Sequence, residues 1–443
     1  MNRNRQGRVV VLGAGLAGLF AARVLSKHAD SVVVVERDVL PTTVGDRRGV
    51  PQGRHAHALL CGGQAVLESL FPGISAELQA QGATVGSLSE QRWLLHGRPL
   101  SLRAELPPAG FMCSRPLLEH CVRARVGALE NVVFREGVGV SGLLATGGQI
   151  EGVLIGTHNN GADPEALSAE LTVDASGRGS KLPMWLAALG YPPPEEERVR
   201  VGVRYASVVA RRNQRDVDGA QCVVVTAAPP NRRCGVAIAI DADRWLLTLQ
   251  GYLGEHVGSS WRDLLEFARG LPSGALHDLM RDSEPLSEVV TATFPYSRYR
   301  RYDRLARHPD GVLALGDAYC SFNPIFAQGM TLAALASQQL EQVLQTTALP
   351  QTWRPFYARC KTLFSEPWAV AAGNDQRFAE LQGPRTRTGE LLSRYMDRLT
   401  RVATGDPEVA AAFLYVAHML APSASLLRPK ILWRVARGPF ERS

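Results

Sequence analysis

Three glycines near the start of the chain have the spacing of a phosphate-binding turn. Gly13, Gly15 and Gly18 form G-x-G-x-x-G between a β-branched run at 9–11 and a stretch rich in small residues. The first glycine permits a tight turn, the second lets the backbone approach a pyrophosphate, and the third lets a helix pack closely on a strand. Amides at the N-terminus of that helix then face the anion. This pattern predicts a dinucleotide site.

An acidic residue closes the second β-branched run. Glu36 ends the run VVVVE, where a carboxylate can accept hydrogen bonds from a ribose 2′-hydroxyl, and Arg37 follows it within the same predicted site. A strand, a helix and a second strand ending in an acid favour a βαβ unit over a chance glycine turn. They also disfavour a signal peptide, so we expect no cleavable leader and a cytoplasmic location.

Composition favours a globular protein. The 443 residues are 45% hydrophobic, enough for two or three packed regions, and no uncharged run reaches the length of a membrane span. The seven cysteines lack C-x-x-C spacing, which favours reduced thiols over disulfides or a zinc site. The net charge of +7 has one dense cluster at 297–308, which is interpreted as a solvated face because no nucleic-acid motif accompanies it.

Several elements must hold these residues. Helices are expected from about 58 to 72 and from 114 to 129, with Ser114 as the N-cap of the latter, and a hairpin is expected around Gly147 and Gly148. Alternating β-rich runs over 199–293 predict an antiparallel sheet. Segment 311–344 returns to a short strand and a helix, and the remaining hundred residues are helical in character.

Three separated motifs carry a family resemblance. GAGLAG at 13–18, DASGRGS at 174–180 and GDAYCSFNPIFAQGM at 316–330 occur in the order found in FAD-dependent monooxygenases of the aromatic hydroxylase type, the group A fold. Two further stretches, at 46–60 and 114–118, together with the sequence after DASGRGS, resemble more closely the flavin epoxidases of polyether pathways. That branch is also similar to squalene epoxidases.

The resemblance implies an α/β fold. A Rossmann-like FAD-binding domain of the glutathione reductase type would carry an inserted antiparallel β-sheet substrate domain and a C-terminal helical region. The expected boundaries are 1–190 for the first part of the FAD domain, with a short substrate-domain excursion near 86–110, then 191–295 for the substrate domain, 296–345 for the return of the FAD domain and 346–443 for the helical region.

The resemblance also implies roles for site residues. Gly13, Gly15 and Gly18 would hold the FAD pyrophosphate and Glu36 the adenosine ribose, while Asp317 would bind the ribityl or pyrophosphate region. Pro324 would lie near the reactive face of the flavin, and the amides of Gly329 and Met330, next to Gln328, would meet its N1 and C2 carbonyl region. This loop is the predicted catalytic element, and no acid or base is assigned.

Cationic contacts to FAD are implied for Arg54 and Arg115, since a guanidinium suits a phosphate. Ordinary ion pairing is an equally weighted alternative for Arg54 and a weaker one for Arg115. Asp174, Gly177 and Ser180 resemble the family's Asp-Gly motif, which contacts both FAD and NAD(P)H. This chain reads DASGRGS there, so the electron source is left open between NAD(P)H and a partner flavin reductase.

Several other residues have both a possible chemical role and a purely structural one. His55 and His57 form H-x-H, but no further ligand at a recognised spacing supports a metal, and a loop role near the flavin is favoured. Cys320 is interpreted as a small buried residue rather than a covalent flavin tether. Aromatic residues of the β-rich region could line a cavity but are more often core; they are Tyr205, Trp245, Phe294 and Tyr296.

The resulting functional prediction is a monooxygenase that transfers one oxygen atom from O₂, through a flavin C4a-hydroperoxide, to a lipophilic natural-product intermediate. Alkene epoxidation or hydroxylation is expected, with no nucleic-acid partner. A flavin-dependent reductase of prenyl or polyketide substrates is the first alternative. A non-catalytic flavin protein at a membrane surface, prompted by the basic tail 426–443, is the second. A halogenase is disfavoured because no G-W-x-W-x-I-P stretch occurs.

Overall fold

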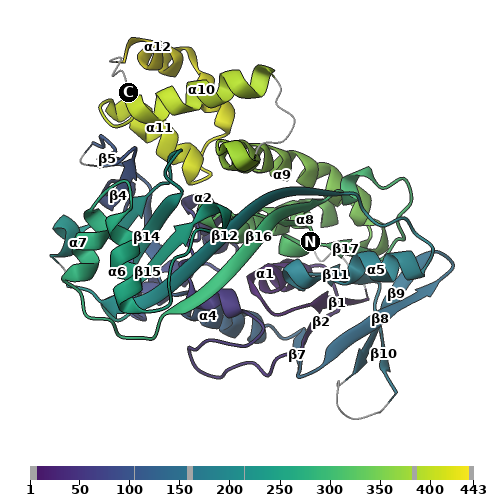
Figure 1. The fold of residues 1–443 in the computed structure, drawn as a ribbon. Coiled ribbons are helices and arrows are strands. Elements are labelled where there is room, and N and C mark those ends of the chain that lie inside the picture. Colours follow the sequence, from purple (N-terminus) through teal and green to yellow (C-terminus); the bar gives the residue numbers. More distant parts are fainter. Residues whose placement is uncertain (1–6, 104, 157–162, 214, 382–386, 439–443) are drawn as a thin grey trace.

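The computed structural model describes residues 7–103, 105–156, 163–213, 215–381 and 387–438. A parallel sheet in the order β17-β11-β1-β2-β7 forms the base of the molecule (Figure 1). Its strands are β1 (Arg8–Leu12), β2 (Ser31–Glu36), β7 (Val132–Glu136), β11 (Leu171–Asp174) and β17 (Val312–Ala314).

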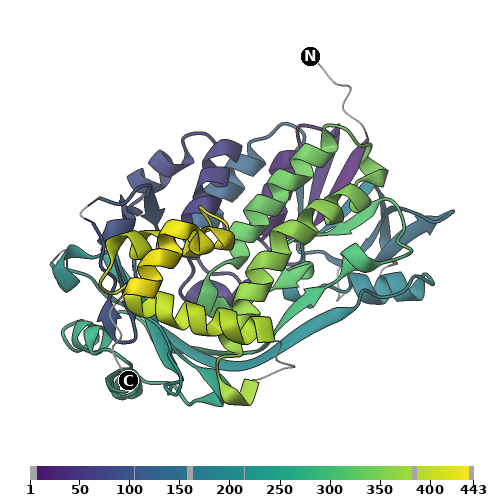
Figure 2. The ribbon, with the colours of Figure 1, turned by 90° about the horizontal axis from the view of Figure 1, so that it is seen from above.

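Both faces of this sheet are covered, as an all-parallel sheet requires. Val9 and Val11 pack against helices on one face, whereas Val10 and Leu12 pack against a three-stranded antiparallel sheet on the other. The helices are α1 (Leu16–Leu25), α4 (Arg115–Gly127), α8 (Gly329–Leu344) and α9 (Trp353–Asp375), and α8 and α9 run side by side (Figure 2). The three-stranded sheet contains β8 (Gly139–Thr146), β9 (Gln149–Gly156) and β10 (Glu165–Ser168).

The second large unit is an eight-stranded sheet, ordered β18-β16-β12-β15-β14-β13-β4-β5. It is antiparallel except where β13 pairs parallel with β4, so the segment near residue 91 joins strands more than a hundred residues away. Its strands are β4 (Gln91–Leu95), β5 (Arg98–Pro99), β12 (Glu196–Arg211), β13 (Cys222–Val225), β14 (Arg233–Ile240), β15 (Arg244–Gly251), β16 (Val290–Arg300) and β18 (Cys320–Ser321). Helices α6 (Trp261–Arg269) and α7 (Ala275–Arg281) cover one face through an apolar cluster around Trp245 and Leu247.

Helices α10 (Arg387–Val402), α11 (Pro407–Ala417) and α12 (Pro429–Arg437) form a separate layer at the top of Figure 1. They reach the large sheet through the β4–β5 region, where the Ser101 amide donates to the Ala403 carbonyl at 3.1 Å. The remaining elements are α2 (Cys61–Leu70), α3 (Ile74–Ala80), α5 (Leu182–Ala188), β3 (Thr84–Ser87) and β6 (Ala109–Met112). The predicted α/β fold, with an antiparallel sheet domain and C-terminal helices, is therefore confirmed.

Within the described ranges, no helix combines the length and apolar character needed to cross a membrane.

Candidate active site

The glycine turn between β1 and α1 is closely packed on one side and open on the other. Gly13 has φ +98°, and a Cβ there would lie 2.8 Å from the Ala175 carbonyl oxygen. A Cβ on Gly18 would collide with the Gly13 carbonyl, so both positions require glycine. A Cβ on Gly15 would meet only the Arg47 guanidinium, at 3.9 Å. The start of α1 therefore presents amides toward open space large enough for an anion to approach.

Glu36 lies beside this turn in a buried network of charges. Its carboxylate accepts from the amides of Ala14 at 2.7 Å and Asp38 at 3.1 Å, and Arg47 contacts it at 3.0 Å. Burial opposes ionisation of Glu36, but Arg47 and the two amides outweigh it and lower its pKa. Glu36 is thus held as a carboxylate beside the glycine turn.

Arg47 joins Glu36 to α4. Its Nε donates to Glu119 at 2.6 Å, and its side chain is only 6% exposed. Arg115 donates to the other oxygen of Glu119, at 3.1 Å. Sequence reasoning missed Arg47, although it lies inside the 46–60 stretch that carries the family resemblance. The signal that could have found it is its position between the acidic end of β2 and the start of α4.

The predicted arginine contacts differ in their surroundings. Arg115 is buried, opens α4 directly after the N-cap Ser114, and also lines the large cavity described below. Arg54 is exposed and pairs with Asp46 at 3.2 Å. Arg37 is exposed and borders a surface hollow of about 410 Å³ next to Asp38 and Arg47. The structure therefore brings Arg115 to the cavity, whereas Arg54 makes the ion pair that was the alternative interpretation.

Asp174, at the end of β11, is fully buried and internally bonded. One oxygen accepts from the amide and hydroxyl of Ser176, and the other accepts from the Ser180 hydroxyl. Gly177 has φ +79° and allows this turn to close. The Asp174 carboxylate therefore shapes the DASGRGS turn, because both of its oxygens accept hydrogen bonds within that turn.

The GD motif follows β17 and leads into the loop before α8. Asp317 is accessible to solvent, but many protein atoms surround its carboxyl group. This burial raises the pKa of Asp317, and it outweighs the opposing effect of the cations Arg178, Arg115 and Arg298. Asn323 caps the turn at 324–326 by accepting from the Ile325 amide at 3.2 Å. Ala327 then takes a left-handed conformation, with φ +52°, and α8 begins at Gly329. The chain thus reaches α8 by a sharply turned loop.

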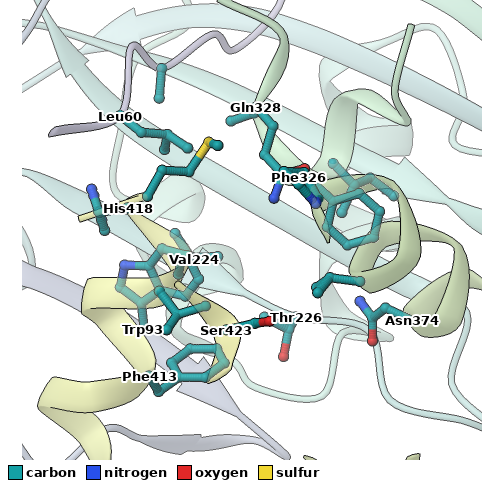
Figure 3. A pocket seen from close by; sticks show the side chains of 18 of the residues that line it. Leu60, Trp93, Val224, Thr226, Phe326, Gln328, Asn374, Phe413, His418 and Ser423 are labelled. Atoms are coloured by element: carbon teal, nitrogen blue, oxygen red, sulfur yellow. The ribbon is translucent and has the colours of Figure 1, made fainter. Parts of the chain in front are cut away.

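One large cavity adjoins this loop. It has a volume of about 1230 Å³ and is lined by Pro324, Gln328 and Met330 from the loop region. Figure 3 shows Gln328 and Phe326 on one side of it, with Trp93, Phe413 and His418 on the other. The Gln328 Oε1 atom is buried without a hydrogen-bond partner. Most lining side chains are apolar, among them Leu60, Trp93, Met112, Val224, Leu363 and Phe413.

The H-x-H segment runs between the large sheet and α8. His55 is buried, its Nδ1 contacts the Ser207 hydroxyl at 2.7 Å, and its ring packs edge-on against Tyr205. His57 lines the cavity, and its Nδ1 lies 2.9 Å from the His55 carbonyl oxygen. The two rings therefore have different partners, and the segment lies in a loop, while its predicted position near a flavin stays a prediction.

A buried polar cluster lies behind the loop. The Asp375 Oδ1 atom accepts from the Tyr252 hydroxyl at 3.0 Å and from the Asn323 side-chain amide at 2.9 Å, while Oδ2 has no partner. Burial raises the pKa of Asp375 to about 7. Sequence reasoning missed this cluster, because its three residues come from separate parts of the chain and no local motif joins them.

The aromatic residues and the cysteine considered in the sequence analysis either lie in the core or contact arginine side chains. Trp245 is fully buried and donates to Asp216 at 3.0 Å, and Arg178 lies 4.5 Å from the ring centres of both Phe294 and Tyr296. Cys320 is buried, which raises the pKa of its thiol. These side chains are not among those that line the cavity, within the part of the chain that the structure describes.

The fold is similar to those of solved flavin-dependent monooxygenases and halogenases. A flavoprotein/dehydrogenase from Cytophaga hutchinsonii matches with a TM-score of 0.69 and 16% identity over 97% of this chain and 96% of that one. PqsL, a probable FAD-dependent monooxygenase from Pseudomonas aeruginosa, matches at 0.62 with 19% identity over 84% and 98%. The flavin-dependent brominase Bmp2 matches at 0.63 with 15% identity over 93% and 98%. At these identities the likeness concerns the fold.

The chain belongs to the same family as Protein Rv3254 of Mycobacterium tuberculosis (strain ATCC 25618 / H37Rv). The two share 33% identity over 430 residues, which cover 93% of this chain and 89% of the relative. No protein-family model matches the chain.

Proposed function

We propose that this protein is an FAD-dependent monooxygenase that inserts one oxygen atom from O₂ into a lipophilic natural-product intermediate, by alkene epoxidation or by hydroxylation. The observation that carries the proposal is the cavity of about 1230 Å³, which is mainly apolar and is bordered by Pro324, Gln328 and Met330. A cavity of this size, lined by apolar side chains with few polar groups, suits a lipophilic small molecule.

The residues present fit FAD. The open side of Gly15 and the amides at the start of α1 suit its pyrophosphate, and Arg47 supplies a cation 3.9 Å from a Cβ placed on Gly15. Glu36 ends β2 and Asp317 follows β17 of the same parallel sheet, and the unpartnered Gln328 Oε1 suits a donor group of the isoalloxazine. When bound and reduced, FAD supplies the electrons that activate O₂ for transfer of a single oxygen atom.

The chain contributes binding, electrostatics and the exclusion of water. The N-terminus of α8, at Gly329 and Met330, carries partial positive charge that stabilises an anionic ring system without reorganisation. The apolar cavity wall keeps water from the reacting groups and orients the substrate toward the loop. The source of electrons, NAD(P)H or a partner reductase, and the cytoplasmic location are parts of the proposal that rest on the sequence.

The family resemblance to polyether-pathway and squalene epoxidases supports an alkene as the reacting group. A flavin-dependent reductase of the same substrates is the second candidate, because a dehydrogenase is among the structures that share this fold. A non-catalytic membrane-surface protein needs no large apolar cavity beside the loop before α8, so the cavity favours an enzyme.

Absorption spectroscopy of the purified protein, before and after addition of FAD, tests cofactor binding. Incubation with a reductant, lipophilic alkenes and ¹⁸O₂ then tests oxygen transfer, and we expect one labelled oxygen per product molecule. Product saturated at the double bond, formed without oxygen, would replace the proposal with the reductase. A requirement for halide would replace it with a halogenase, and a protein that takes up no flavin would refute it.

A further inference from the structure

We infer that His57 is the hydrogen-bond acceptor with which this cavity selects substrates that carry a hydroxyl group. The ligand class is a lipophilic alcohol or phenol, with its hydroxyl at the end of the cavity nearest the loop before α8. The inference rests on the proposed function, since it specifies the substrate of the same site.

The hydrogen bond of Nδ1 fixes the tautomer of the His57 ring. A carbonyl oxygen can only accept, so His57 Nδ1 must donate its proton to the His55 carbonyl, 2.9 Å away. In a neutral imidazole the other nitrogen then carries a lone pair. Burial, the positive charge of Arg115 and the His55 ring lower the pKa of His57 to about 4, although the bond to the His55 carbonyl opposes the shift. Nε2 is therefore an acceptor, not a donor, at neutral pH.

Contacts on either side of His57 hold it where the sheet meets α8. The Ala56 amide donates to Thr248 of β15 at 2.9 Å, and the Leu60 amide donates to Thr331 of α8 at 3.0 Å. Thr331 is two residues after the start of α8, which the loop at 324–328 precedes. A hydroxyl bound by His57 would thus lie at the loop end of the cavity.

Several other polar side chains of the cavity are hydrogen-bonded within the protein, whereas Gln328 Oε1 and His418 Nδ1 are buried without a partner among the described residues. Gln64 bonds to the Leu59 and Phe111 backbone, and Thr226 donates to the Leu94 carbonyl. The Gln91 Oε1 atom accepts from Trp93 and contacts His418. Among the described residues, His57 Nε2 makes no such bond, although its ring lines the cavity.

A hydrogen-bond acceptor without a partner in an apolar cavity favours ligands that can donate a hydrogen bond to it. A site built to bond a hydroxyl discriminates strongly against the analogue that lacks it, because the polar group of the site then stays unpaired. Because the pKa of His57 is low, the ring accepts the hydrogen bond without removing the proton, so His57 acts as a substrate-binding residue.

Two variants distinguish the roles of the two nitrogens of the His57 ring, and a third variant is the control. His57→Asn places an amide near Nδ1, which keeps the bond to the His55 carbonyl and removes the acceptor at Nε2. His57→Gln places a carbonyl oxygen near Nε2 and keeps the acceptor. His96→Asn is the matched control, because His96 lines the same cavity but its Nε2 already contacts Thr400 at 3.0 Å.

The measurement is equilibrium dialysis of each FAD-treated protein against geraniol and against the same diene without its hydroxyl group. We expect His57→Asn to weaken geraniol binding roughly tenfold and to leave the hydrocarbon within about twofold. His57→Gln and His96→Asn are expected to keep the preference for geraniol within about threefold. Thermal unfolding checks that each variant is folded.

The inference is overturned if His57→Asn weakens both ligands equally, if it weakens neither, or if neither ligand binds the wild-type protein. The flavin content of the same samples is measured separately by absorbance. Bound flavin without discrimination between the ligands would remove the inference and leave the proposed function intact. Discrimination without bound flavin would remove the proposed function and leave the hydroxyl site.

Discussion

Two buried carboxyl groups in this molecule have opposite surroundings. Glu36, beside the glycine turn, has two backbone donors and the Arg47 guanidinium, and its pKa is lowered. Asp375, behind the loop before α8, has two neutral donors and no cation, and its pKa is raised to about 7. Burial opposes ionisation of both groups, so the difference lies in the partners.

This difference in partners distinguishes the surroundings of the glycine turn from those of the cavity. Beside the glycine turn, Glu36, Arg47, Glu119 and Arg115 form a chain of alternating charges. Beside the cavity, Asp375 lies next to the lining residues Asn374 and Gln376, and its hydrogen-bond donors are neutral side chains. A charged network thus borders the glycine turn, and a neutral hydrogen-bonded cluster lies beside the mainly apolar cavity.

Breaking the charged network should have the largest effect. Arg47→Met leaves Glu36 and Glu119 buried without their shared cation, so we expect the free energy of unfolding to fall by about 3–5 kcal/mol. Urea unfolding measures the change. Arg54→Met is the control, because the exposed Arg54–Asp46 pair should contribute less than about 1 kcal/mol. Equal losses in the two variants would contradict the assigned network.

Neutralising the second carboxyl should have a smaller effect of opposite sign. The pKa of Asp375 rises from 3.8 to about 7 on folding, so this group lowers stability progressively as the pH rises through that interval. Asp375→Asn should therefore raise the free energy of unfolding by about 2–4 kcal/mol near pH 9 and change it little near pH 4. Urea unfolding at both pH values measures this, and a gain that does not depend on pH would refute the titration.

Removing one donor from Asp375 should have the smallest effect. Tyr252→Phe deletes the hydroxyl that donates to Oδ1 at 3.0 Å, with an expected loss of about 1 kcal/mol near pH 8. Because that bond favours the ionised form, the apparent pKa of Asp375 should rise further. Unfolding of Tyr252→Phe alone and combined with Asp375→Asn measures the coupling. Strictly additive changes in the free energy of unfolding would show that the two side chains do not interact.

The sequence predicted the fold class because its signals are local. The glycine spacing, the β-branched runs and the break at Gly147–Gly148 each reflect neighbouring residues, and β8 and β9 pair across that break. The cap at Ser114 was predictable for the same reason, and it accepts from the Leu117 amide at 3.3 Å.

The site was only partly predictable, because much of it depends on packing between distant segments. Tyr252, Asn323 and Asp375 meet across more than a hundred residues, and β4 joins β13 across a similar span. The free nitrogen of His57 depends on a backbone carbonyl two residues away and on a cavity wall from several elements. Glu36 and Arg47 are eleven residues apart, but their pairing depends on how the chain between them folds back toward α4.

The strand order of the parallel sheet has a consequence for synthesis on the ribosome. The edge strand β17 pairs with β11, but Ala314, at the end of β17, is synthesised 140 residues after Asp174, at the end of β11. At a synthesis rate of about 5–20 residues per second, one edge of β11 stays unpaired for roughly 7–28 s before β17 has been made. An unpaired edge invites association with other chains. The sheet that carries the glycine turn is therefore most vulnerable to aggregation while the large antiparallel sheet is still being made.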